Sequence, residues 1–185
     1  TAREFLTTHC SPAVVQQLEE SDLGYSPELV SQVAGFGWFG LGIPEEYGGV
    51  GGSLLHLIAL YEEIGRALFP SPHFSTVVLS APLLVAAGSE QQKQHWLPEV
   101  AKGQALLTLA FREPDYTYDP LPAQTTARHQ GKEIILNGHK MFVHNAHTAD
   151  ELMVTAHLDG QVALVLVPRT APGVTIRPLE TVAGD

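Results

Sequence analysis

The hydrophobic pattern of this chain changes its period once, near Gln104. Before that residue, apolar side chains recur every three or four positions, which is the spacing of an amphipathic helix. After it, apolar and polar residues alternate between turn-forming Gly, Pro, Asp and Asn, which is typical of strands. The change predicts an α+β fold with an all-helical domain over residues 1–104 and a β domain over residues 105–185.

Serine residues mark the predicted helix starts. A hydroxyl that precedes proline can cap a helix whose first position tolerates the missing proline N–H, and Ser89 with Gln92 matches a capping box. The predicted helices follow Ser11-Pro12, Ser26-Pro27, Ser53 (to about Leu68), Ser71-Pro72 (interrupted at Pro82 and closed by Gly88) and Ser89 (past Trp96, with a turn at Pro98 and an end at Gly103).

Short alternating segments fill the second half of the chain. The predicted strands are 106–111, 124–129, 133–137, 141–143, 152–157, 162–167 and 174–177. Because they follow one another at short spacing with turn residues between them, they predict an antiparallel β-barrel or sandwich and not βαβ units.

Two glycine-rich segments invite a phosphate-binding interpretation. Residues 35–40 spell G-x-G-x-x-G, but a helical pattern precedes them and Ile43-Pro44 follows. The dinucleotide fingerprint needs a strand before it and a helix after it, so this copy does not predict a nucleotide site. Residues 40–53 predict a long loop that is either a connector or a phosphate cradle without the usual lysine.

Composition excludes several partners. A net charge of −10 argues against nucleic acid and against an anionic membrane surface, and no apolar run is long enough to span a bilayer.

A single cysteine, Cys10, cannot form an internal disulfide, which predicts a cytoplasmic location. His139, His144 and His147 do not have a spacing that predicts a metal site. The chain starts at Thr1 and stops at Asp185 without a closing element, so we expect a fragment of a longer protein.

Six short motifs, in order along the chain, carry a resemblance. They are Leu-Gly-Ile-Pro-Glu-Glu-Tyr-Gly-Gly-Val-Gly at 41–51, Glu-Glu-Ile-Gly-Arg at 62–66, Gly-Ser-Glu-Gln-Gln-Lys at 88–93, Trp-Leu-Pro at 96–98, Leu-Asn-Gly-His-Lys at 136–140 and Pro-Gly-Val at 172–174. From about Phe5 to the last residue, the chain resembles the acyl-CoA dehydrogenase family.

The resemblance implies an oxidoreductase of fatty acid metabolism that oxidises the Cα–Cβ bond of an acyl-CoA thioester and passes hydride to FAD. It implies a helical domain, a middle antiparallel β domain and a C-terminal helical bundle that supplies the catalytic glutamate. No catalytic residue is therefore expected within these 185 residues. The implied partners are the acyl-CoA substrate, an electron-transferring flavoprotein and further subunits of a homo- or hetero-oligomer.

The stretch Leu109–Asp119 joins the two kinds of secondary structure, and in the family it contacts the flavin. Glu113, Pro114 and Asp119 match the family pattern, but Arg112 stands where threonine is usual and Tyr116-Thr117-Tyr118 replaces small residues. The second flavin contact of the family falls at 142–144. The predicted cofactor-binding residues are Phe111, Arg112, Thr117, Tyr118, Phe142, Val143 and His144, of which His144 replaces the expected hydroxyl residue.

These departures leave two interpretations open. In one, Arg112 favours reduced anionic flavin and His144 donates a hydrogen bond to the ring. In the other, the bulky residues close the site, and the chain is a non-catalytic or flavin-deficient partner subunit of a heteromeric acyl-CoA dehydrogenase. A binding module unrelated to redox chemistry is a third hypothesis. Arg128, Lys132 and Lys140 are either contacts for coenzyme A phosphates or solvated hairpin charges.

Overall fold

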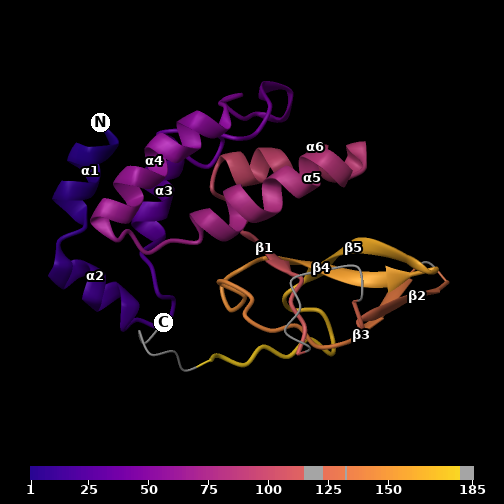
Figure 1. Cartoon of the computed structure of the whole chain (residues 1–185). Coiled ribbons are helices and arrows are strands. Elements are labelled where there is room, and N and C mark those ends of the chain that lie inside the picture. Colours follow the sequence, from indigo (N-terminus) through magenta and orange to yellow (C-terminus); the bar gives the residue numbers. More distant parts are fainter. Residues whose placement is uncertain (115–122, 132, 180–185) are drawn as a thin grey trace.

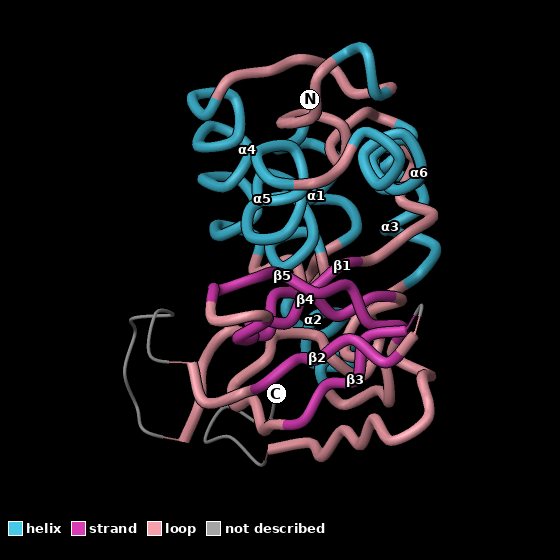
Figure 2. The backbone as a smooth tube through the Cα atoms, turned by 90° about the vertical axis from the view of Figure 1, so that its right-hand side faces the viewer, coloured by secondary structure: helices cyan, strands magenta, loops and turns pink. Residues whose placement is uncertain are grey.

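A computed structural model describes residues 1–114, 123–131 and 133–179 of the chain. Helices α4 (Leu54–Ala67), α5 (Ala81–Ala87) and α6 (Glu90–Ala101) lie on one side of a five-stranded sheet (Figure 1). Figure 2 shows the same layers from the side, with helices over the sheet. A helical domain followed by a β-sheet domain was the predicted order.

Hydroxyl caps start three helices where the sequence predicts them, at Ser11, Ser26 and Ser89, whereas no side chain caps the helix expected after Ser71. The Ser11 hydroxyl accepts from Val14 N–H at the start of α2 (Pro12–Glu19), and the Ser26 hydroxyl accepts from Leu29 N–H at the start of α3 (Pro27–Gly35). Ser89 and Gln92 form the predicted capping box of α6. A further helix, α1 (Ala2–His9), begins with its own capping box between Thr1 and Glu4 and was not predicted.

The region around the two internal prolines differs from the prediction. The helix expected after Ser71 is a π-helix, η2 (Phe74–Ser80), which passes directly into α5. Pro82 has no N–H for the preceding turn, and a π-helical turn is one way in which a helix accommodates such a loss. Ser80 donates to the Ser75 carbonyl oxygen within η2 (2.7 Å). Helix α6 continues through Pro98 to Ala101, where a turn was expected.

The sheet is mixed and not purely antiparallel. Its strands are β1 (Leu107–Ala110), β2 (Thr126–Gln130), β3 (Glu133–Asn137), β4 (Glu151–Leu158) and β5 (Gln161–Pro168). The hairpins β2–β3 and β4–β5 are antiparallel, as the turn residues predict, but β1 and β2 both pair with β4 in parallel. These parallel pairs join segments that are distant in sequence, so no turn signal reveals them.

Two predicted strands are absent from the described residues. Residues 141–143 form no strand because Phe142 has a positive φ of 55°, which breaks an extended backbone. Residues 174–177 form no strand and have no strand partner among the described residues. Alternation of apolar residues identifies a segment that suits a sheet, and it cannot show that a partner strand exists.

One hydrophobic cluster joins the helices to the sheet. Ala81 and Leu84 of α5 and Leu97 and Val100 of α6 pack with Met153 of β4 and with other sheet residues. A second cluster fills the space among α1, α3 and α4, and a third lies under the loop that precedes β4. The sheet is therefore held against the helical layer by a shared core.

The glycine-rich loop 40–53 is a packed connector. Val50 N–H donates to the Gly40 carbonyl oxygen (2.8 Å) and Gly51 N–H donates to that of Ile43 (2.9 Å). A Cβ at Gly49 would collide with the Ile43 main chain, so the loop closes tightly on itself. A Cβ at Gly52 would likewise collide with the Leu41 carbonyl oxygen, so packing requires glycine at positions 49 and 52. Gly35, the first glycine of the G-x-G-x-x-G segment, ends helix α3, so that segment follows a helix as predicted.

A buried histidine links three parts of the helical layer. The His73 ring is 1% exposed; its Nε2 lies 3.0 Å from the Trp38 carbonyl oxygen and its Nδ1 lies 2.7 Å from the Tyr61 hydroxyl. A carbonyl can only accept, so Nε2 carries the proton and Nδ1 accepts from Tyr61. Burial lowers the pKa of His73 to about 4, against a smaller opposing effect of the Trp38 carbonyl.

Candidate functional site

Two loops meet beyond the end of β1, namely residues 111–114 and residues 138–145. Met141 N–H donates to the Arg112 carbonyl oxygen (2.9 Å), which joins the loops through their main chains. The guanidinium carbon of Arg112 lies 5.0 Å from the centre of the Phe142 ring, within cation–π range. The structure thus brings together two segments that the sequence separates by about thirty positions.

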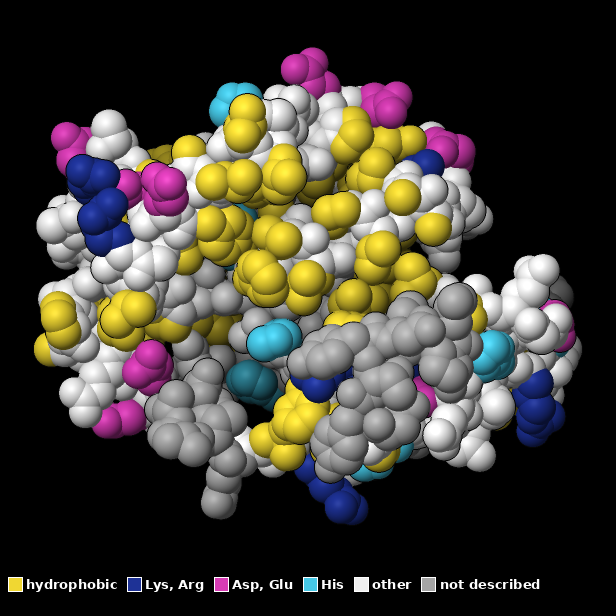
Figure 3. Space-filling view, viewed as in Figure 1, with side chains coloured by type: hydrophobic (Ala, Val, Ile, Leu, Met, Phe, Trp, Pro, Cys, Tyr) yellow, Lys and Arg dark blue, Asp and Glu magenta, His cyan; other side chains and the backbone are white. Residues whose placement is uncertain are grey.

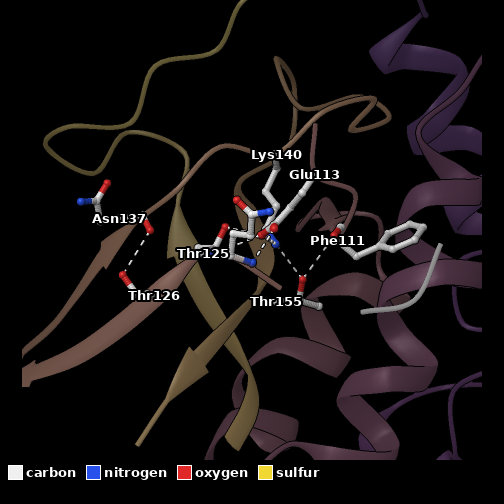
Figure 4. Close-up of polar contacts among 8 residues, drawn as sticks. Phe111, Glu113, Thr125, Thr126, Asn137, Lys140 and Thr155 are labelled. Carbon is white, nitrogen blue, oxygen red and sulfur yellow. Dashed lines mark hydrogen bonds and ion pairs between the residues drawn. The ribbon is translucent and has the colours of Figure 1, made fainter. Parts of the chain in front are cut away.

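A buried ion pair fastens the two loops (Figure 4). Lys140 Nζ lies 2.6 Å from Glu113 Oε1, with only 8% and 5% of the two side chains exposed. The Glu113 carboxylate also accepts from Thr125 Oγ1 (2.6 Å), from Thr125 N–H (3.0 Å) and from Gln124 N–H (2.5 Å). Lys140 donates further to Thr155 Oγ1 of β4 (2.9 Å). We call these five residues the Glu113 cluster.

The Glu113 carboxylate is ionised at neutral pH. Burial raises the pKa of this carboxyl, but the hydrogen bonds from Lys140, Thr125 and Gln124 outweigh burial and bring the pKa to about 2. A buried charge that is paired and fully hydrogen-bonded is tolerated, whereas an unpaired one is costly. Lys140 is consequently engaged inside the protein, and the hypothesis that it contacts coenzyme A phosphates is wrong for this structure.

Gly138 allows the second loop to approach the cluster. A Cβ on this residue would collide with the Thr125 side chain, whose hydroxyl donates to Glu113. The Asn137-Gly138 pair therefore serves close packing against residue 125. No hairpin turn forms at this pair, because β3 ends at Asn137 and pairs only with the preceding strand β2 among the described residues.

The loop Phe142–Asn145 has an unusual backbone. Phe142 and Asn145 both have positive φ angles, 55° and 53°, which are uncommon for residues other than glycine. Thr108 Oγ1 of β1 donates to the His144 carbonyl oxygen (2.5 Å), and Ser75 Oγ of η2 lies 3.1 Å from Asn145 Oδ1. Contacts from both layers thus hold this loop in a strained shape, and such strain is common at ligand sites.

The main chain of this loop fits a ligand that accepts hydrogen bonds. Phe142 and His144 are exposed and Val143 is half-buried. Within the described part of the chain, no acceptor receives the N–H of Val143 or of His144. Two neighbouring amides without an acceptor can donate hydrogen bonds to polar atoms of a flavin ring. The side-chain hydroxyl expected at residue 144 is replaced by an imidazole, whose ring stands edge-on to Phe74 at 6.4 Å.

Five of the seven predicted cofactor-binding residues lie together, namely Phe111, Arg112, Phe142, Val143 and His144. Thr117 and Tyr118 lie outside the described residues. Sequence reasoning missed the Glu113 cluster. The available signal was that Glu113 and Lys140 both match the family pattern, and such matches can mark structural pairs as well as ligand contacts.

Two of the three histidines that lie close in sequence, His144 and His147, have separate surroundings. His147 Nε2 lies 3.2 Å from the Leu23 carbonyl oxygen, and His144 faces Phe74. Over the described ranges, no three His, Cys, Asp or Glu side chains are arranged to hold a metal ion. In the same ranges, no helix is both long enough and apolar enough to cross a bilayer.

Comparison with known proteins assigns both halves of the chain. Residues 1–104 match the N-terminal domain of acyl-CoA dehydrogenases, and residues 108–185 match the middle domain. The curated acyl-CoA dehydrogenase FadE26 of Mycobacterium tuberculosis is 31% identical over 166 residues, covering 85% of this chain and 41% of the relative. The chain thus spans about two fifths of that relative's length.

Solved structures show the same fold. An acyl-CoA dehydrogenase from Bacillus anthracis, solved as a complex with FAD, superposes with a TM-score of 0.85 at 30% identity, covering 97% of this chain and 31% of that one. The ChsE4–ChsE5 complex from M. tuberculosis gives a TM-score of 0.87 at 26% identity, covering 97% of this chain and 48% of that one. The chain belongs to the acyl-CoA dehydrogenase family and carries its N-terminal and middle domains.

Proposed function

We propose that this chain forms the flavin-facing part of an acyl-CoA dehydrogenase that oxidises the Cα–Cβ bond of an acyl-CoA thioester. The observation that carries the proposal is the Glu113 cluster, because it holds residues 111–112 beside residues 142–144. Both segments are the family's flavin contacts by resemblance. The similar Bacillus anthracis enzyme is itself described as complexed with FAD.

Each segment has a distinct role in this proposal. The free N–H groups of Val143 and His144 bind polar atoms of the flavin ring, and the strained loop fixes their direction before the cofactor arrives. Arg112 places a cation at the same surface, which stabilises negative charge on the ring. FAD, when bound, supplies the acceptor for the hydride. The base that removes the α-proton comes from a further helical part of the protein.

An exposed apolar surface supports the expectation of a further helical part. Leu54, Leu55 and Ile58 of α4 are 69%, 75% and 49% exposed, and Leu68 just beyond the helix is 70% exposed. Figure 3 shows hydrophobic side chains gathered over the helical half of one face. Exposed patches of this kind mark interaction surfaces. A cytoplasmic location, for which the single cysteine Cys10 is the support, and electron transfer to an electron-transferring flavoprotein, which the resemblance implies, complete the proposal.

Absorption of the purified full-length gene product tests the flavin proposal. We expect a yellow protein, and we expect Arg112→Thr to lower the flavin midpoint potential because a cation near the reduced ring is lost. Arg128→Thr is the matched control, since Arg128 lies on β2 and its removal should leave the potential unchanged. A colourless protein that takes up no FAD contradicts the proposal.

A second candidate function is a flavin-deficient partner subunit. The stacking of the Arg112 guanidinium on the Phe142 ring favours it, because the stacked pair occupies the surface where the family presents a small hydroxyl. The similar ChsE4–ChsE5 structure is a complex of two differently named proteins.

Two results separate this candidate from the first. A partner subunit should co-purify with a paralogue that keeps the usual Thr-Glu-Pro segment. The double variant Arg112→Thr/His144→Thr should then gain FAD affinity, because it removes bulk from the surface and restores hydroxyls. Loss of affinity in that variant favours the catalytic candidate.

A further inference from the structure

The edge strands of the sheet differ in length, in charge and in how far other residues cover them. β1 is covered at Leu107, where the Thr76 hydroxyl of η2 both accepts from the Leu107 N–H (3.2 Å) and donates to its carbonyl oxygen (3.0 Å). β3 is five residues long and begins with a charged residue, Glu133. β5 is eight residues long, contains no charged residue, and within the described ranges pairs only with β4.

The hydrogen-bond alternation shows which groups of β5 face outward. Arg169 N–H donates to the Asp150 carbonyl oxygen (3.0 Å), so this pair, which continues the β4–β5 register, is a hydrogen-bonded one. In an antiparallel ladder such pairs alternate with pairs whose main-chain groups point away. Val162, Leu164 and Leu166 therefore direct their N–H and carbonyl groups to the edge that β4 does not occupy.

A strand edge that no described residue covers is a template for another strand. Proteins usually block long edges with charges, prolines, bulges or short strands, and Val162–Val167 has none of these devices. A main-chain edge also specifies the chemistry of its partner, which must be an extended segment with matching hydrogen-bonding groups.

We propose that β5 pairs antiparallel with β5 of a second copy of this chain, about a two-fold axis at Leu164. In this register Val162 faces Leu166 of the other copy, and outward groups meet outward groups. The same register sets Asp159, whose side chain is 77% exposed and lies 3.7 Å from His129 Nε2 of its own chain, opposite Arg169 of the other copy. Arg169 Nε donates to the Ala149 carbonyl oxygen of its own chain (2.9 Å), so the terminal nitrogens of its guanidinium are the groups that meet Asp159. Two parallel β5 strands could not be related by this two-fold axis, so only the antiparallel pairing gives a closed dimer.

Charge complementarity thus favours a second copy as the occupant. The Asp159–Arg169 contact occurs twice in the dimer, once at each end of the paired strands. It opposes the long-range repulsion between two chains that each carry a net charge of −10, which salt at physiological strength screens beyond about 8 Å. This inference does not depend on flavin binding, and its test uses no cofactor.

Sedimentation velocity of the 185-residue chain at physiological salt measures the dimer directly. The chain has a mass of 20.0 kDa, and we expect a species of twice that mass that dissociates on dilution. Val162→Pro removes an outward donor that β4 does not use, and should raise the dissociation constant about ten-fold or more. Val162→Thr keeps the donor and is the matched control, with less than about a three-fold change.

Charge reversal and hydrogen exchange provide independent checks. Asp159→Arg should weaken the dimer, and Asp159→Arg combined with Arg169→Asp should restore it. The amides of Val162, Leu164 and Leu166 should exchange slowly only at concentrations where the dimer forms. A monomer at every concentration, a dimer indifferent to Val162→Pro, or amides already protected in the monomer by the chain's own residues would each overturn the proposal.

Discussion

Lys140→Met is expected to lower the free energy of unfolding by about 3–5 kcal/mol at neutral pH. The substitution keeps most of the side-chain volume but leaves the Glu113 carboxylate buried without its cationic partner. Chemical denaturation followed by circular dichroism measures the loss. Because the cluster joins residues 111–114 to residues 138–145, we also expect the amide resonances of both loops to move in the variant.

An exposed ion pair of similar geometry is the control. Lys102 Nζ lies 2.9 Å from Glu99 Oε1, but the side chains are 58% and 40% exposed, so Lys102→Met should cost less than about 1 kcal/mol. The double variant Glu113→Gln/Lys140→Met should recover part of the loss, because no unpaired charge remains. Equal effects of Lys140→Met and Lys102→Met would contradict the structural role of the cluster.

Acid should destabilise the protein in two steps. The pKa of His73 is about 4 in the folded protein, below its usual 6.5, so its contribution is present above pH 6.5 and is lost between about pH 6.5 and 4. The pKa of Glu113 is about 2, below its usual 4.5, so its contribution is present above pH 4.5 and is lost between about pH 4.5 and 2. Each group contributes about 3 kcal/mol to the free energy of unfolding at neutral pH.

Glu151 acts in the opposite direction. Burial, with a smaller contribution from the charge of Asp150, raises the pKa of Glu151 to about 6, so protonation of this carboxyl between pH 6 and 4.5 stabilises the folded state. Unfolding free energies measured from pH 7 to 2 should therefore fall more steeply in Glu151→Gln. His73→Gln should remove the upper step and Glu113→Gln the lower one. A free energy of unfolding of Glu151→Gln that stays constant between pH 6.5 and 4 would contradict the conclusion that His73 is buried and neutral.

The helices could be located from the sequence because their signals are local. A serine cap acts on the N–H groups of the next turn, so Ser11, Ser26 and Ser89 identify their helices without knowledge of the rest of the fold. The same local chemistry was present in Thr1 and Glu4, where the capping box of α1 was overlooked. The π-helical register at Phe74–Ser80 depends on Pro82 together with the packing of Thr76 against β1, and only the first is visible in the sequence.

The sheet was harder to derive because strand pairing is not local. Hairpin turns predicted the antiparallel pairs, but the parallel pairing of β1 with β4 joins residues more than forty positions apart. Residues 141–143 have the composition of a strand, yet Phe142 adopts a positive φ in a loop that contacts from Thr108 and Ser75 help to hold. Tertiary contacts overrode the local pattern there.

The candidate site was predicted in part. Family resemblance identified residues 111–112 and 142–144, and the structure places them side by side. The resemblance did not identify the ion pair that holds these segments together, because Glu113 and Lys140 are 27 positions apart and lysines in hairpins are usually solvated. Burial, which the sequence does not show, turns this lysine from a ligand candidate into a structural residue.

Titration of the ¹⁵N-labelled 185-residue chain with FAD tests the central claim most directly. If residues 111–112 and 142–144 form the flavin-facing surface, the amides of Val143 and His144 should shift in a saturable manner together with those of Phe111 and Arg112. Amides on α1, which packs against α4 in the helical layer, should stay unchanged. Absence of any shift at these four residues at FAD concentrations up to about 1 mM, or shifts confined to other parts of the chain, would contradict the account.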